Sequence, residues 1–195
     1  MRYSRDELMA AVSGQMPEKR WKHTLGVMET AVKLAERFGA DPAKADLAAI
    51  LHDVAKYWPV KDMEQVIRDN PELNQDLLNH DKQLWHSEVG ALVARRDYGI
   101  EDPDILDAIR WHTSGRVGMS LLDKVVCLAD YIEPGRDFPG VNNIRELAQH
   151  SLEKALIAGF DSTISFLLQQ QRVIYPLTVL SRNDLIQHLI PTGGS

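Results

Sequence analysis

Features that mark secreted, membrane and disulfide-bonded proteins are scarce in this 195-residue sequence. It contains one cysteine, Cys127, so no disulfide can form within the chain, as is usual in the reducing cytoplasm. No apolar run approaches the roughly 20 residues of a membrane-spanning helix. Residues 1–8 lack the apolar core of a signal peptide. We therefore expect a cytoplasmic protein without a membrane segment.

Positive charge is also in deficit. Lysine and arginine total 22 against 28 aspartates and glutamates, which gives a net charge of −6. Non-specific nucleic-acid binding needs a basic surface, so the charge argues against a nucleic-acid partner. A small phosphate substrate stays compatible, because metal ions and a few local cations can supply the positive field. The 44% hydrophobic and 26% charged residues are those of an ordinary globular domain.

Helical patterns cover nearly the whole chain, and no stretch alternates apolar and polar residues long enough to predict a strand. Ser4 and Glu7 form an expected capping box. Residues 133–141 contain two prolines and two glycines and are expected to form a loop. We predict an all-α bundle in one domain, residues 1–195. The expected helices cover about 17–38, 41–56, 60–70, 86–98, 104–112, 120–132 and 176–190, with one or two further helices in 143–171.

One dipeptide, His52-Asp53, lies inside the apolar run AAILHDVA. An ionised carboxylate buried among apolar residues costs several kcal/mol unless it is paired. A metal ion is a natural partner, because imidazole and carboxylate are both good ligands for first-row metals. The run from Asp46 to Lys56 is predicted to be helical, and neighbouring helical residues lie about 100° apart. Both side chains can therefore turn toward one cavity.

Further candidate ligands follow in the order H…HD…H…H…D. Six ligands are more than one ion needs, whereas two ions bridged by Asp53 would use them all. Taken singly, the other histidines have plainer interpretations as surface or helix-end residues. Together they favour a metal centre. The six candidates are His23, His52, Asp53, His86, His112 and Asp130.

Several neighbouring residues are candidates for phosphate contacts. Lys56 is predicted on the same helix face as His52 and Asp53, although it could equally be a solvated lysine at the helix end. Arg136 follows Asp130 in the expected loop, where its guanidinium suits a bidentate phosphate contact. Its alternative role is an ion pair with Asp137 or Glu133. The turn of Thr113, Ser114 and Gly115 offers hydroxyl and backbone N–H donors, although it could also be a simple helix stop.

Four segments resemble the YqeK-type branch of the HD superfamily of metal-dependent phosphohydrolases. They read LHDVAKYW, WHSEVGALVA, IRWHTSGR and LADYIEPGRDFPGV. The resemblance covers about residues 19–140 with specific motifs and extends more diffusely to about 189. It implies a single HD domain with its metal-site core at about 19–140 and C-terminal helices at about 143–190.

The resemblance also implies the activity and its cofactor. Members of this branch are symmetrical diadenosine tetraphosphate hydrolases with a di-iron centre. By analogy, one ion takes His23, His52, Asp53 and Asp130, and the other takes Asp53 with the two remaining histidines. Lys56 and Arg136 would then stabilise the phosphoryl transition state. The substrate is a small nucleotide, and the sequence leaves the oligomeric state open, a homodimer included.

Two alternatives stay open at this point. One is an HD-domain nucleotide phosphohydrolase of other specificity, acting on deoxynucleotides or guanosine polyphosphates. The other is a metal-binding nucleotide sensor without turnover. The filled ligand positions argue against a sensor that has lost its ligands. The residues alone also leave the metal open among iron, manganese, cobalt, nickel and zinc.

Overall fold

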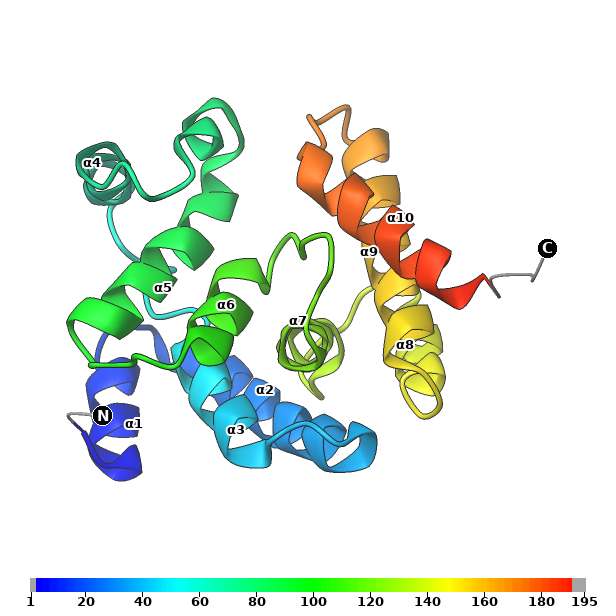
Figure 1. The fold of residues 1–195 in the computed structure, drawn as a ribbon, viewed down its shortest axis with the longest axis horizontal. Coiled ribbons are helices and arrows are strands. Elements are labelled where there is room, and N and C mark those ends of the chain that lie inside the picture. Colours follow the sequence, from blue (N-terminus) through cyan, green and yellow to red (C-terminus); the bar gives the residue numbers. More distant parts are fainter. Residues whose placement is uncertain (1–2, 191–195) are drawn as a thin grey trace.

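The computed structural model describes residues 3–190, and within that range every regular element is helical (Figure 1). This confirms the predicted all-α class. The helices are α1 (Arg5–Ser13), α2 (Glu18–Phe38), α3 (Pro42–Leu51), α4 (Val60–Asp69), α5 (Trp85–Arg96), α6 (Pro103–Trp111), α7 (Leu121–Ile132), α8 (Val141–Leu147), α9 (Leu152–Gln169) and α10 (Pro176–Leu189), with 3₁₀ turns at Gln75–Asn79 and Lys82–Leu84.

Local sequence explains where the first helices begin and end. The capping box of Ser4 and Glu7 is confirmed, since each side chain accepts a hydrogen bond from the other residue's backbone N–H. Gly39 ends α2 with a φ of +83°, a left-handed conformation that a residue without a Cβ adopts cheaply. Asp41 then caps α3, and Pro42 occupies its first turn.

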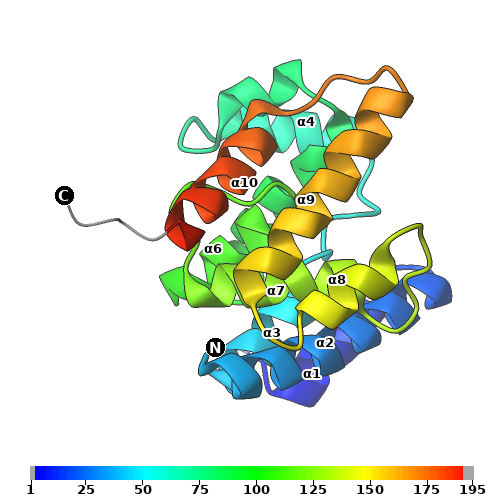
Figure 2. The ribbon, with the colours of Figure 1, turned by 90° about the vertical axis from the view of Figure 1, so that its right-hand side faces the viewer.

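The helices pack in two layers around a buried hydrophobic core. Helix α2 packs against α3 and α7, and α6 packs against α3, α5 and α7 (Figure 1). Small residues in α3, such as Ala48 and Ala49, are fully buried and allow close helix contact. Helices α8, α9 and α10 form the second layer, which covers α7 (Figure 2).

The predicted helix through Lys56 is wrong at its C-terminal end, because α3 stops at Leu51. Beyond it the backbone tightens into turns with i→i+3 hydrogen bonds, such as Lys56 N to Asp53 O at 2.9 Å. The physical reason is a competing donor. The His52 imidazole Nδ1 lies 2.6 Å from the carbonyl oxygen of Ala49, the oxygen that a continuing helix would offer to the N–H of Asp53.

The expected loop at 133–141 lies between α7 and α8, except that its last residue, Val141, is already the first residue of α8. Its start is tied down by Arg145, whose guanidinium donates to the carbonyl oxygens of Ile132, Glu133 and Arg136. The loop therefore has a defined course beside the end of α7. Among residues 3–190, no helix combines the length and hydropathy needed to span a bilayer.

Candidate metal centre

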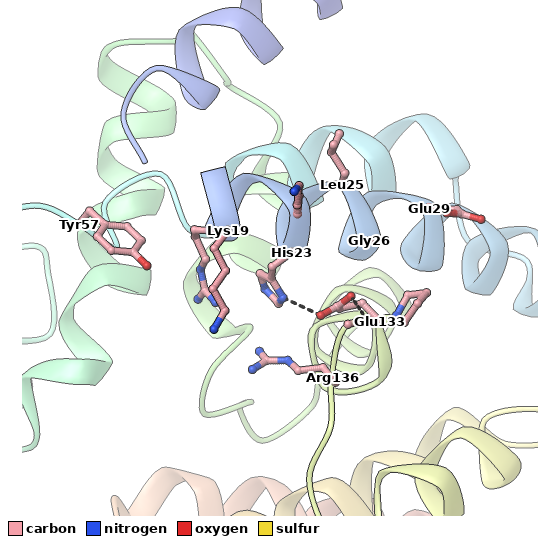
Figure 3. A pocket seen from close by; sticks show the side chains of 12 residues that line it. Lys19, His23, Leu25, Gly26, Glu29, Tyr57, Glu133 and Arg136 are labelled. Atoms are coloured by element: carbon pink, nitrogen blue, oxygen red, sulfur yellow. Dashed lines mark hydrogen bonds and ion pairs between the residues drawn. The ribbon is translucent and has the colours of Figure 1, made fainter. Parts of the chain in front are cut away.

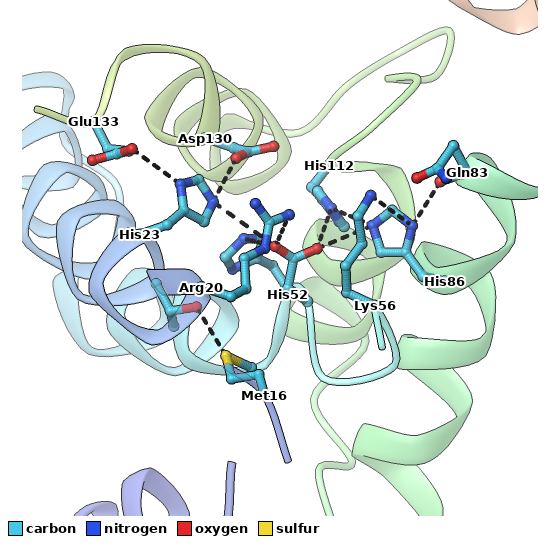
Figure 4. A network of polar contacts seen from close by, with 12 residues as sticks. Met16, Arg20, His23, His52, Lys56, Gln83, His86, His112, Asp130 and Glu133 are labelled. Atoms are coloured by element: carbon cyan, nitrogen blue, oxygen red, sulfur yellow. Dashed lines mark hydrogen bonds and ion pairs between the residues drawn. The ribbon is translucent and has the colours of Figure 1, made fainter. Parts of the chain in front are cut away.

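The six candidate ligands come together from five separate elements at the middle of the bundle (Figure 4). The helices that carry them are far apart in sequence, so only the packing of the bundle unites them. They are His23 on α2, His52 and Asp53 directly after α3, His86 in the first turn of α5, His112 directly after α6, and Asp130 on α7.

Asp53 lies between two pairs of histidines, and each carboxylate oxygen faces one pair. Its Oδ2 lies 3.0 Å from Nε2 of His52 and 3.8 Å from Nε2 of His23. Its Oδ1 lies 3.1 Å from Nε2 of His86 and 3.9 Å from Nε2 of His112. The carboxylate therefore offers one oxygen to each of two groups of imidazoles, as a bridging ligand must.

Three of the histidines share one orienting contact. The Nδ1 atoms of His52, His86 and His112 lie 2.6, 2.7 and 2.7 Å from the backbone carbonyl oxygen three residues earlier. A carbonyl oxygen can only accept a hydrogen bond, so Nδ1 must carry the proton. The lone pair is then on Nε2, the atom that faces Asp53. Such contacts orient metal-binding histidines in proteins.

His23 is oriented by a side chain instead. Its Nδ1 donates to Oε1 of Glu133 at 3.0 Å, and its Nε2 lies 3.0 Å from Oδ1 of Asp130. Glu133 is 4% exposed and also accepts a hydrogen bond from the backbone N–H of Gly135 at 2.5 Å. The carboxylate of Glu133 therefore links this histidine to the start of the 133–141 loop.

Several buried polar atoms of the cluster make no hydrogen bond within the described residues. They are Nε2 of His23, Nε2 of His52 and both carboxylate oxygens of Asp53. An unsatisfied buried polar group costs about 1–3 kcal/mol. An ion pair with Arg20 offsets part of that cost at Oδ2 of Asp53, and a bound cation would satisfy all four atoms. Two sets of ligand atoms lie within 4.8 Å of one another: His23, His52 and Asp130, and His52, Asp53 and His112. The site fits divalent metal ions.

The protonation states also suit a metal. Burial alone would raise the pKa of Asp53 and Asp130, but the surrounding histidine and arginine side chains hold both well below the ordinary value of 3.8. Burial lowers the pKa of His86 and lowers that of His112 to about 3. At neutral pH the cluster therefore combines ionised carboxylates with neutral imidazoles at His86 and His112, which are the metal-binding forms. Burial alone would lower the pKa of His52, but the charge of the neighbouring Asp53 raises it, so protonation of this imidazole competes with metal binding.

Two arginines accompany the carboxylates. Arg136 pairs through Nη2 with the carboxylate of Asp130, and its Nε donates to the Asp130 carbonyl oxygen at 2.7 Å. This pairing replaces the alternatives with Asp137 or Glu133 that the sequence suggested. Arg20 pairs with Oδ2 of Asp53. Each guanidinium therefore lies next to a proposed metal ligand, where a substrate phosphate would also have to lie.

Lys56 reaches the centre from the turn after α3 rather than from the helix itself. Its Nζ lies 3.4 Å from Nδ1 of His86. Burial lowers the pKa of this lysine, against the opposing effect of Asp53. Lys56 therefore lies beside the candidate ligands as predicted, although it projects from a turn and not from the predicted helix.

The turn after α6 is divided between two environments. Thr113 lines a cavity next to His112, and its buried Oγ1 has no hydrogen-bond partner among the described residues. Ser114 is buried elsewhere and donates to the Gly115 carbonyl oxygen at 2.9 Å. A Cβ at Gly115 would lie 2.8 Å from Cζ of Phe160. Of the three predicted phosphate contacts, the structure brings only Thr113 to the cavity, because packing takes up the other two.

A cavity of about 720 Å³ opens beside His23 (Figure 3). We call it the cationic cavity, because four basic side chains line it: Lys19, Arg20, Lys22 and Arg136. Glu133 lies in its wall, with its carboxylate directed at His23 (Figure 3). A concave, positively charged surface next to the cluster is suited to a polyphosphate.

Two residues of this region were missed from the sequence. Arg20 precedes His23 by three positions and Glu133 follows Asp130 by three, so each shares a helix face or helix end with a predicted ligand. That spacing was the available signal. It is weak by itself, since many charged residues stand three positions from a histidine or aspartate.

Comparison with known proteins agrees with this geometry. The family model described as HD domain matches residues 20–135, which contain all six clustered ligands. The chain belongs to the HD-domain family. A solved structure supports the assignment: the crystal structure of a predicted HD superfamily hydrolase involved in NAD metabolism from Clostridium acetobutylicum has a TM-score of 0.91 and 39% identity. The match covers 96% of this HD-domain chain and 100% of that one.

Curated relatives of this HD-domain protein carry a more specific name. A symmetrical bis(5'-nucleosyl)-tetraphosphatase from Bacillus subtilis (strain 168) is 50% identical over 183 residues, which is 94% of this chain and 98% of the relative. A protein of the same name from Staphylococcus aureus (strain NCTC 8325 / PS 47) is 42% identical over 167 residues, covering 85% of this chain and 86% of the relative.

Proposed function

We propose that this protein hydrolyses diadenosine tetraphosphate symmetrically to two molecules of ADP. The observation that carries the proposal is the buried Asp53 carboxylate, whose two oxygens face two different pairs of imidazole Nε2 atoms. The substrate assignment is supported by relatives of this name at 50% and 42% identity over most of both chains. We assign residues 1–195 to one HD domain, with the metal-site core at about 19–140 and C-terminal helices at about 143–190.

We assign two first-row metal ions to the centre, and the family resemblance favours iron. One ion would be held by His23, His52, Asp53 and Asp130, and the other by Asp53 and the histidines on the Oδ1 side. When bound, two such ions would activate water as the nucleophile near neutral pH and offset the negative charge of the phosphates.

The chain's own residues would position the polyphosphate. Arg136 and Arg20 each lie beside a proposed ligand carboxylate and line the cationic cavity. Their guanidinium groups can donate two parallel hydrogen bonds to phosphate oxygens. Lys56 adds a third cation on the other side of Asp53, and Thr113 adds a hydroxyl that has no hydrogen-bond partner in the described part of the chain. These groups would stabilise the charge that builds up on the phosphoryl oxygens in the transition state.

The reaction breaks the central anhydride of the four-phosphate chain. The oxygen of water bonds to one inner phosphorus, and the bond from that phosphorus to the central bridging oxygen breaks. The bridging oxygen leaves as the terminal phosphate oxygen of one ADP, and the water oxygen becomes part of the other. The protons released by water are taken up by the products and the solvent. The single cysteine is buried as a free thiol, which is compatible with the cytoplasm, where we place this activity.

Hydrolysis in oxygen-18 water tests the proposal. Mass spectrometry should find ADP as the sole nucleotide product, with label on the terminal phosphate of one ADP in each pair. A panel of deoxynucleotides and guanosine polyphosphates should be turned over much more slowly. AMP plus ATP would mean that the bound chain is displaced by one phosphate, so the symmetrical assignment would be wrong even with the metal centre right. The Asp53→Ala variant, purified in parallel, is the control for contaminating hydrolases.

A further inference from the structure

A second cavity adjoins the metal cluster. Its volume is about 890 Å³, and it lies between the end of α7, the 133–141 loop, α8 and α9. His112 and Asp130 form part of its wall, so it opens directly onto the proposed metal centre. Arg136 lines both this cavity and the cationic one. A volume of this size falls within the range of roughly 300–1,000 Å³ found for small-molecule sites.

Aromatic side chains distinguish this second cavity, which we call the aromatic cavity. Phe138 comes from the loop and Phe166 from α9, while Tyr131 on α7 is fixed by a 2.7 Å hydrogen bond to Thr163. Phe166 is 54% exposed, although phenylalanine is usually well buried in a folded domain. An uncovered ring at the rim of a cavity is a suitable stacking surface for a flat aromatic ligand.

Hydrogen-bonding groups complete the lining. Asn143 on α8 and Gln169 at the end of α9 both line the aromatic cavity, and their side-chain amides make no hydrogen bond to other described residues. Besides Asp130, the carboxylate of Asp161 also lines the cavity, and it accepts a hydrogen bond from Nε of Arg182 at 2.7 Å. Free amides can pair with the adjacent donor and acceptor atoms on the edge of a purine base.

We infer that the aromatic cavity holds one nucleoside of the dinucleoside polyphosphate, with its base stacked on Phe166. This inference rests on the proposed function and specifies how that substrate lies. The attached phosphates pass Arg136, which borders both cavities, to reach the metal centre. The other half of the substrate extends into the cationic cavity. The two equal halves of the molecule are therefore held by chemically different surfaces, one aromatic and amide-bearing and one basic.

Calorimetric titration with two probes tests the inference without turnover. ADP carries a nucleoside and two phosphates, whereas pyrophosphate carries only the phosphates. The wild-type metal-containing protein should bind ADP more tightly than pyrophosphate. Phe166→Ala should weaken ADP binding roughly tenfold, as loss of base stacking does elsewhere, and should leave pyrophosphate binding unchanged. Phe166→Trp should restore ADP affinity, because it restores a stacking ring.

Leu168 supplies the matched control. It lies two residues away on α9, is 62% exposed and does not line the aromatic cavity, so Leu168→Ala should change neither affinity. Equal ADP affinity in wild type and Phe166→Ala would overturn the inference, as would equal affinity of the wild type for both probes. A protein that needs Phe166 for ADP but fails to hydrolyse diadenosine tetraphosphate would refute the proposed function and keep the cavity assignment.

Discussion

Glu133 offers a selective way to disturb the proposed metal centre without removing a ligand. Among the four clustered histidines, His23 is the one whose Nδ1 is held by a side chain, whereas the others donate to backbone carbonyl oxygens. Glu133→Ala leaves Nδ1 of His23 and the N–H of Gly135 without their acceptor. Loss of such an orienting partner weakens metal binding about 10–100-fold, or about 1.4–2.7 kcal/mol. We expect that loss at the ion held by His23.

Two further variants should lower metal affinity by different amounts. Glu133→Gln keeps an oxygen acceptor and loses only the charge, so its loss of metal affinity should be smaller than that of Glu133→Ala. Gly26→Ala keeps the carboxylate of Glu133 but adds a Cβ that would lie 2.5 Å from Oε2 of Glu133. The carboxylate must then shift, and because its Oε1 is the acceptor for Nδ1 of His23, we expect metal affinity to fall, by no more than in Glu133→Ala. Glu29→Ala is the control, since this exposed acid lines the same cavity and, among residues 3–190, pairs only with Lys33.

Competition against a chelator of known affinity, with elemental analysis after dialysis, measures the effect on each ion. Circular dichroism checks that the helices persist. One ion should be lost at a lower chelator concentration in Glu133→Ala and Gly26→Ala, while the second ion and the Glu29→Ala control stay at wild-type values. Folded Glu133→Ala and Gly26→Ala proteins that hold both ions as tightly as wild type would refute the reasoning that Glu133 orients a metal ligand.

Three other expectations follow from the same contacts. Asp53→Ala should lose most of the bound metal, whereas His112→Ala should retain up to one ion by elemental analysis; two ions in both would contradict the bridging assignment. Arg136→Ala and Lys56→Ala should each lower kcat by roughly 10²–10³ with unchanged metal content. A variant that turns over at the wild-type rate would show that the replaced residue has only a structural role. Hydrogen bonds from the N-cap lower the pKa of Glu7, so its stabilising effect is complete above its ordinary pKa of 4.5 and is lost as the pH falls through the lower folded value. The difference in unfolding free energy between wild type and Glu7→Gln should therefore shrink in acid, as measured by urea denaturation.

Helix positions followed closely from the sequence, because caps and breakers are local signals. Pro42 and Gly39 flank the junction of α2 and α3 as predicted. The error at the end of α3 has a tertiary cause. Residues 48–55 are all buried, so their apolar pattern has no polar face that marks the period. The helix ends where the imidazole of His52 bonds to a backbone carbonyl oxygen, and nothing in the apolar pattern reveals that contact.

The candidate ligands could be selected from sequence because each is chemically out of place in an apolar helix. Arg20 and Glu133 could not be selected in that way. A charged residue near a helix end is ordinary, and its role emerges only when a distant partner is known: Asp53 for Arg20 and His23 for Glu133. Ser114 shows the converse case. It has the right chemistry and position in the chain, but its hydroxyl is directed to a neighbouring carbonyl oxygen.

The helical class, the order of the six candidate ligands and the absence of any internal disulfide all follow from the amino-acid sequence, because periodicity, residue chemistry and composition are properties of the chain alone. Tertiary structure alone decided which oxygen of Asp53 faces which histidines and where the two cavities lie. Those relations depend on how five elements, separated by up to about a hundred residues, pack against one another. Packing geometry of that kind is set by the whole core at once, and no local segment encodes it.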